Sequence, residues 1–199
     1  MPSNSANEKY VDHQRLRRAW EAYQAADYAT ALTEYSVLAE KGHPHAWIYL
    51  GLLHKQGFGV PQDYSKAQLC FNHAIALGDV FALVKLGRLY NEKVNGAAEK
   101  AFDCFLNAAN KGNLSGIYWT GRAYLRGRGT KKNIEKAREY LTTAIGRGHV
   151  YARMEYCAAQ SKGIYGPGQI IAGLFGVFKT IVVMIKILRS DPHGERLLI

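Results

Sequence analysis

Residues 46–78 read AWIYLGLLHKQGFGVPQDYSKAQLCFNHAIALG. Both ends of this stretch carry apolar residues three and four positions apart, which is the pattern of an amphipathic helix. The glycines of Gly57-Phe58-Gly59 predict a turn between the two helices, because glycine adopts left-handed backbone conformations easily. Asp63 is suited to cap the second helix by accepting backbone N–H bonds. The stretch therefore predicts two helices joined by a short turn.

The same pattern returns along the chain. Small-residue pairs occur at Gly42-His43, Gly78-Asp79, Gly112-Asn113 and Gly148-His149, at spacings of 36, 34 and 36 residues. Aligned on these pairs, the first helix of each unit has small residues at two positions and the second helix has apolar residues at three. The first-helix positions are Ala46, Ala82, Gly116 and Ala152, then Gly51, Gly87, Gly121 and Cys157; the second-helix positions are Ala67, Ala101 and Ala137, then Phe71, Phe105 and Leu141, then Ala74, Ala108 and Ala144. Small residues let two helix backbones approach closely, so each unit predicts one packed helix pair.

Five such pairs can be counted, the last of them unusual, and no alternating pattern typical of strands is present. A single pair cannot bury its apolar faces, so neighbouring pairs are expected to stack. The predicted fold is an all-α, right-handed α-solenoid of about five antiparallel helix pairs. We expect a polar leader over 1–13, repeats over 14–163, and a hydrophobic, basic helix and tail over 164–199.

The loops within pairs carry a more specific pattern. Residues 50–71 fit L-G-x-L-(H/Y)-x-x-G-x-G-V-x-x-(D/N)-x-x-K-A-x-x-x-(F/Y), residues 120–141 fit it well, and residues 86–105 fit it with a deletion. This pattern resembles the Sel1-like repeat, a relative of the tetratricopeptide repeat. The resemblance implies an α-solenoid that serves as a scaffold or adaptor for other proteins. It does not extend to the secreted branch that pairs two cysteines within each repeat.

Charge divides the chain into two halves. Residues 1–110 carry 11 basic and 11 acidic side chains, whereas residues 111–199 carry 15 basic and 5 acidic ones, so the whole net charge of +10 lies in the second half. This asymmetry predicts an anionic partner at the C-terminal end. The first twenty residues lack the apolar run of a secretory signal, and the three cysteines form no CxxC pair. Reduced cysteines and a cytoplasmic location are expected.

One face of the first helices is variable between repeats, which favours a partner-binding groove. Exposed aromatic and arginine residues are typical of binding hot spots. The predicted partner-binding residues are Tyr49, Leu52, Lys55, Lys85, Arg88, Asn91, Trp119 and Arg122. For Tyr49 and Trp119 the alternative is simple packing between repeats.

Motifs for chemistry are missing from the sequence. No zinc, nucleotide-binding or hydrolase motif occurs, and His43 and His149 stand where other repeats have a polar residue at the start of a helix. We therefore expect no catalytic residue, no metal and no cofactor. Nucleic acid is not expected as a partner either, because no recognition helix or set of stacking aromatics accompanies the basic residues.

Residues 170–188, IIAGLFGVFKTIVVMIKIL, replace the half-polar helix that a repeat would have. A helix of this length would span about 28 Å, but a lysine near its middle makes insertion only marginally favourable, at about −5 kcal/mol from apolar residues against about +3 from Lys179. A helix lying in the membrane interface suits the wide apolar face better. Its predicted membrane-contact residues are Ile170, Leu174, Phe178, Lys179, Ile181, Ile185 and Lys186.

We expect nearby cations to face anionic lipid together with this helix, namely Arg126, Arg128, Lys131, Lys132, Lys136, Arg138, Arg153, Lys162 and Arg189. The open alternatives for 170–188 are a membrane span, a dimer or partner interface, and an ordinary core helix.

The functional hypothesis is a non-enzymatic protein–protein interaction scaffold or adaptor, peripheral or tail-anchored at the cytoplasmic face of a membrane. The alternative is a soluble partner-binding or immunity-type protein that buries the C-terminal helix in a homodimer or heteromeric interface.

Overall fold

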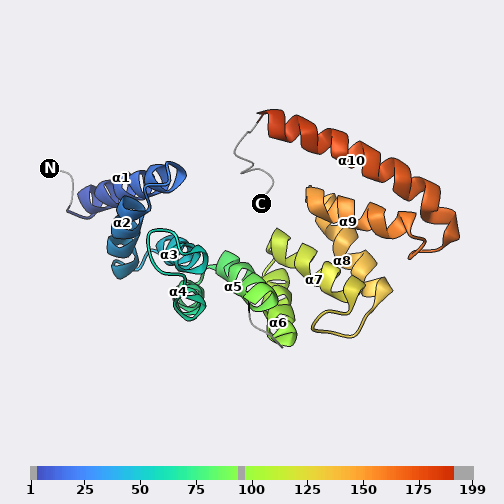
Figure 1. Cartoon of the computed structure of the whole chain (residues 1–199), viewed down its shortest axis with the longest axis horizontal. Coiled ribbons are helices and arrows are strands. Elements are labelled where there is room, and N and C mark those ends of the chain that lie inside the picture. The colour runs from blue at the N-terminus through green and yellow to red at the C-terminus, as the bar shows by residue number, and fades with distance from the viewer. Residues whose placement is uncertain (1–3, 94–96, 191–199) are drawn as a thin grey trace. The chain divides into compact units, whose positions relative to one another are not determined.

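The computed structural model describes residues 4–93 and 97–190, with side chains for residues 10–92, 97–166 and 168–185. Within these residues the chain is all-α, with ten α-helices in five consecutive pairs, as predicted (Figure 1). The helices are α1 (Asn4–Gln24), α2 (Tyr28–Glu40), α3 (Pro44–Gln56), α4 (Tyr64–Ala76), α5 (Val80–Lys93), α6 (Ala98–Asn110), α7 (Leu114–Arg126), α8 (Ile134–Gly146), α9 (Val150–Ser161) and α10 (Ile170–Ser190), with a short 3₁₀ helix, η1 (Pro167–Gln169), before α10. Helix α1 begins within the segment 1–13 that the sequence analysis treats as a leader.

The chain forms two compact units, unit 1 (Met1–Leu89) and unit 2 (Tyr90–Ile199), with the boundary inside α5. In unit 1, α1 packs on α2, α2 on α3, and α3 on α4. In unit 2, α6 packs on α7, α7 on α8, α8 on α9, and α9 on α10. Each of these helices therefore packs against a neighbour in sequence, as stacked repeats must.

The helix ends follow the predicted caps. The side chain of Asp63 accepts a hydrogen bond from the backbone N–H of Lys66 at 2.9 Å, and Asn133 does the same with Lys136 at 2.9 Å. Gly57 and Gly127 end α3 and α7 in the left-handed conformation, at φ 75° and 65°. These caps fix where each pair turns, and so they fix which side chains the turn presents.

The aligned small residues lie where helices come closest. A methyl group on Gly51 would clash with the ring of Phe71, and one on Gly116 would lie 2.6 Å from the Cβ atom of Ala108. The aligned second-helix residues are fully or almost fully buried, including Phe71 and Phe105. The repeat pattern thus predicted the core correctly.

Candidate functional site

The predicted groove residues of unit 1 are largely part of its core. The ring of Tyr49 stacks on that of Tyr35 with centroids 4.7 Å apart, and it meets Trp20 and Tyr23 edge-on. Leu52 is half-buried. The packing alternative therefore describes Tyr49 well.

Lys55 corrects the prediction, because the residue is only 7% exposed. Positions three apart on a helix do not stay on one face: each step turns by about 300°, so two steps carry the side chain about 120° away from the first. Leu125, at the equivalent position of α7, is 7% exposed as well. The third position of the predicted stripe thus turns toward the packed side of the repeat.

Lys85 and Arg88 lie on α5 and are half-buried. The ammonium nitrogen of Lys85 is 4.5 Å from the ring centroid of Phe81 on the same helix. Both belong to unit 1, whereas Asn91, Trp119 and Arg122 belong to unit 2.

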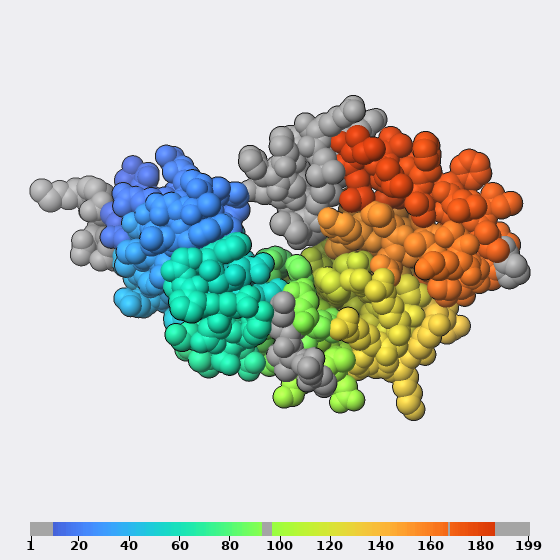
Figure 2. Space-filling view, viewed as in Figure 1, coloured from blue at the N-terminus to red at the C-terminus, as the bar shows by residue number. Residues whose placement is uncertain are grey.

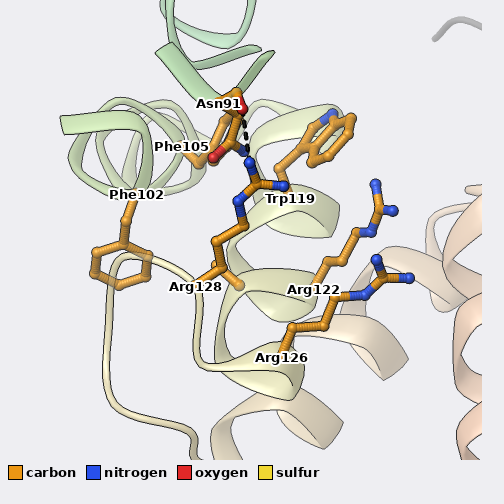
Figure 3. A pocket seen from close by; sticks show the side chains of 8 residues that line it. Asn91, Phe102, Phe105, Trp119, Arg122, Arg126 and Arg128 are labelled. Carbon is orange, nitrogen blue, oxygen red and sulfur yellow. Dashed lines mark hydrogen bonds between the residues drawn. The ribbon is translucent and has the colours of Figure 1, made fainter. Parts of the chain in front are cut away.

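In unit 2 these last three predicted residues come together in one pocket (Figure 3). The pocket has a volume of about 30 Å³, which is room for about two water-sized groups. Its lining comes from the end of α5, from α6, from α7 and from the turn after α7. The lining residues are Asn91, Phe102, Phe105, Trp119, Arg122, Ala123, Arg126 and Arg128.

Aromatic rings form one wall of the pocket. The ring of Trp119 stacks on the ring of Phe105, with centroids 5.2 Å apart and planes 16° from parallel. The guanidinium carbon of Arg122 lies 4.8 Å from the Trp119 ring centroid, a cation–π contact. Trp119 is half-buried, so it packs between helices and also faces the pocket.

Three guanidinium groups surround the pocket. Arg122 and Arg126 extend side by side from α7, and Arg128 reaches toward Asn91 (Figure 3). Arg126 donates two hydrogen bonds, of 3.1 and 2.8 Å, to Oε1 of Glu155, whose other oxygen lies 3.7 Å from Nε of Arg122. Arg128 donates to the main-chain carbonyl of Asn91 at 2.6 Å. Two of the three cations thus share one carboxylate, and the third binds a neutral oxygen.

Two polar atoms of the lining are left unsatisfied. Nε of Arg122 and the side-chain oxygen of Asn91 are buried and have no hydrogen-bond partner among the described residues. A buried donor or acceptor without a partner costs about 1–3 kcal/mol. The pocket therefore holds one unmatched donor and one unmatched acceptor.

Arg126 and Arg128 are pocket residues that the sequence analysis assigned to lipid contact instead. Arg128 stands between Gly127 and Gly129, at φ 65° and 73°, and a methyl group on Gly129 would collide with the main chain of Ala98. The turn must therefore lie against the start of α6, which directs Arg128 to the pocket. The sequence did contain a signal for this difference. The residue between the two glycines is an arginine here, whereas it is Phe58 in the turn of residues 57–59.

A second candidate surface is the outer face of α10. The helix packs on α9 through its small residues: a methyl group on Gly173 would meet Ser161 and Cys157 of α9, and Thr180 is fully buried. Its large apolar residues point the other way and are 37–74% exposed. They are Ile170, Ile171, Leu174, Phe175, Phe178, Ile181, Val182 and Ile185. Figure 2 shows this helix at the surface of unit 2.

Most of the predicted membrane-contact residues are exposed, including Lys179; the side chain of Lys186 lies outside the described residues. The prediction did not include Ile171, Phe175 and Val182, which are exposed on the same face. The better signal was the small-residue spacing of Gly173, Gly176 and Thr180, which marks the face packed on a neighbouring helix.

Among the described residues, no helix combines the length and the apolar character needed to cross a bilayer. The basic turn between α7 and α8 also lies apart from α10, with α8 and α9 between them (Figure 1). Among the described side chains, cations close to α10 include Lys179 on the helix itself and Arg153, which lines a hollow with Thr180 and Val183 on the side packed against α9.

The groups most often used in catalysis have packing roles here. Burial raises the pKa of the Cys70 and Cys104 thiols to about 11, and all three cysteines are unpaired thiols. His149 caps α9 by accepting the N–H of Ala152 at 3.1 Å, and burial lowers its pKa to about 4. In the part of the chain that the structure describes, no three His, Cys, Asp or Glu side chains gather as a metal site would require.

Known structures share this arrangement of helices. A Sel1 repeat protein from Oxalobacter formigenes matches with a TM-score of 0.65 and 21% identity, over 74% of this chain and 61% of that one. The protective antigen c5321 of uropathogenic Escherichia coli, which displays an SLR fold, matches with a TM-score of 0.64 and 20% identity, over 77% of this chain and 33% of that one. A protein of Pseudomonas aeruginosa, PA5086, matches with a TM-score of 0.56 and 22% identity, over 82% of this chain and 66% of that one. The matched part is thus less than two thirds of each of these proteins, and the likeness concerns the fold.

The sequence itself matches the Sel1 repeat three times in succession, over residues 44–79, 80–113 and 114–149. These segments cover more than half of the 199 residues. They begin within one residue of the starts of α3, α5 and α7, so each spans one helix pair. Proteins built from this repeat are generally scaffolds for protein–protein interaction. With its repeats in register with its helix pairs, this chain belongs to the Sel1 repeat family.

Proposed function

We propose that this protein is a non-enzymatic adaptor that binds a protein partner at the unit 2 pocket and attaches to a membrane surface through the outer face of α10. The partner-binding part is supported above all by the pocket, where Trp119 and three arginines meet beside two unsatisfied polar atoms. Tryptophan and arginine are the residues most enriched at binding hot spots. The unit 1 residues that correspond to Trp119 and Arg128 are Tyr49 and Phe58, and their rings stack on Tyr35 and Tyr28 instead.

The membrane part is supported by the size of the apolar face on α10. Its eight exposed residues present on the order of 900 Å² of surface, more than the roughly 300–600 Å² of the largest patch on a typical monomer. Lys179, which is exposed on the same helix, complements anionic headgroups. A second copy is disfavoured as the occupant, because the chain carries a net charge of +10 and two copies of it repel each other.

Photo-crosslinking tests the partner-binding part. The phenylalanine analogue p-benzoylphenylalanine, placed at position 102, keeps the ring of a pocket residue that is half-buried. The matched control places the same analogue at position 58, where the ring packs on Tyr28 in unit 1. In cells of the source organism, position 102 should yield a discrete adduct with another protein and position 58 should not. Equal adduct patterns at both positions would contradict the proposal.

Liposome flotation tests the membrane part. The variant carrying Phe175→Glu and Phe178→Glu should lose binding to vesicles of phosphatidylcholine and phosphatidylglycerol. A variant carrying Leu69→Glu and Leu77→Glu, at exposed apolar positions of unit 1, should float like the original protein. Wild-type protein that stays with the aqueous fraction and elutes as a dimer would contradict membrane attachment and support the interface alternative.

A further inference from the structure

The charges around the unit 2 pocket are not balanced within the protein. Arg126 has a close ion pair with Glu155, at 2.8 Å, and Arg122 approaches the same carboxylate only to 3.7 Å. Arg128 has no carboxylate within ion-pair distance among the described residues, and its one hydrogen bond goes to the carbonyl of Asn91. A guanidinium group has five N–H donors, so most of the donors of Arg128 have no acceptor among the described residues.

The aromatic wall favours a flat, two-pronged anion. The cation–π contact with Trp119 positions the guanidinium of Arg122, and a guanidinium can present paired N–H groups to a carboxylate. The side chains of Arg122 and Arg126 already approach one carboxylate of the protein itself, Glu155. The pocket volume of about 30 Å³ suits the two oxygens of such a group.

We infer that the pocket binds an acidic segment of the protein partner, with a glutamate or aspartate carboxylate held among Arg122, Arg126 and Arg128 and an adjoining apolar side chain against Phe102 and Trp119. This inference rests on the proposed partner binding and names the chemical class of the partner. A peptide is favoured over a nucleic acid because two arginines of this pocket already lie beside a carboxylate of the protein itself, that of Glu155.

Fluorescence anisotropy with the full chain tests this. The probe is a short fluorescein-labelled peptide with four glutamates and one phenylalanine in a glycine–serine background, and the comparison peptide has glutamines in place of the glutamates. We expect the glutamate peptide to bind about tenfold more tightly than the glutamine peptide. Equal affinity for the two peptides, or binding of neither, would overturn the inference.

Variants locate the binding. Arg122→Gln and Arg128→Gln should each weaken binding of the glutamate peptide about tenfold, whereas Lys131→Gln, which removes the same charge from the turn after α7 without touching the pocket, should change it less than twofold. Arg122→Lys keeps the charge but loses the paired N–H donors of the guanidinium, so it should still weaken binding several-fold. Equal losses for Arg128→Gln and Lys131→Gln would mean unspecific attraction and would overturn the inference. Circular dichroism and melting temperature verify that each variant is folded.

Two competitors separate the sources of negative charge. Inorganic phosphate and a short single-stranded oligothymidylate should displace the peptide only at concentrations where salt does so. Tight binding of the oligonucleotide, lost in Arg128→Gln, would assign the pocket to nucleic acid instead. If the adduct at position 102 forms as before in Arg122→Gln and Arg128→Gln proteins, the partner-binding function stands and the acidic class of partner is wrong.

Discussion

The turn after the first helix of a repeat has the same backbone in both units and carries a different residue at its tip. In Gly57-Phe58-Gly59 and Gly127-Arg128-Gly129 both glycines have positive φ, and the middle N–H donates to the equivalent carbonyl, of Leu53 at 3.0 Å or Ala123 at 3.1 Å. Phe58 stacks on Tyr28, with ring centroids 4.5 Å apart, and so packs its turn against the start of α2 in unit 1. Arg128 instead lines a pocket of unit 2. The glycines set the shape of the turn, and the residue between them decides whether the turn packs on a neighbouring ring or lines a pocket.

The arginine–glutamate groups of the two units differ in the same sense. In unit 1 the buried carboxylate of Glu34 accepts from Arg15 at 2.7 Å and from Arg18 at 2.9 Å, so both cations are matched. In unit 2 Glu155 forms a close ion pair with Arg126, at 2.8 Å, whereas its other carboxylate oxygen lies 3.7 Å from Nε of Arg122. A matched group fastens two helices together, whereas an unmatched one leaves donors for a ligand.

The strongest test of the shared turn is Gly129→Ala. Positive φ costs an alanine about 1–2 kcal/mol, and the added methyl group would collide with Ala98, so we expect a loss of about 4 kcal/mol in the free energy of unfolding. Gly112→Ala has a similar φ of 77° but nothing within 4 Å of the new methyl group, and should lose only about 1 kcal/mol. Urea unfolding measures both; equal losses would show that the contact with α6 does not hold the turn.

Acid should weaken unit 2 through His149. Its pKa is about 4 in the folded protein against the ordinary value of 6.5 in the unfolded chain, so the unfolded chain binds more protons between these values. The contribution is fully present above pH 6.5 and is lost as pH falls toward 4, by at most about 3 kcal/mol. His149→Asn places on α9 the cap that Asn113 supplies to α7, and should remove this part of the pH dependence. Identical stability profiles from pH 7 to 4 would refute the assignment.

Removing one carboxylate from each arginine group sharpens the second comparison. Glu34→Gln breaks two close pairs at a buried site and should cost about 2 kcal/mol of stability. Glu155→Gln should cost under about 1 kcal/mol, because Arg126 is half-exposed and Arg122 is already distant. Thermal melts of the two variants should therefore differ clearly. A larger loss for Glu155→Gln would mean that the unit 2 group is the structural one.

The smallest expected effect on folding is that of Arg128→Phe, which gives the unit 2 turn the residue of unit 1. Stability should stay within about 0.5 kcal/mol, since the residue is exposed and the glycines are untouched. Binding of the glutamate peptide should nevertheless fall about tenfold, as anisotropy would show. Unchanged binding with an unchanged melting temperature would show that the residue at the tip of this turn takes no part in binding the peptide.

The sequence predicted the fold well because each repeat shows the same pattern again, so every expectation rests on several copies. The glycine spacing predicted the pairs, Asp63 and Asn133 capped the helices as expected, and the aligned alanines are buried. Prediction failed where helix rotation or a tertiary contact decides. Lys55 turned inward because steps of three drift around the helix, and Arg128 was assigned to lipid because only the packing of its turn on α6 directs it to the pocket.

The central claim is that unit 2 holds arginines for an acidic ligand while unit 1 holds equivalent charges for its own structure. Arginine Nε–H resonances, followed by NMR during titration with the glutamate peptide, report on both groups in one sample. The signals of Arg122, Arg126 and Arg128 should shift with a common saturation curve, and those of Arg15 and Arg18 should stay in place. Equal shifts in both groups, or none in unit 2, would contradict the account.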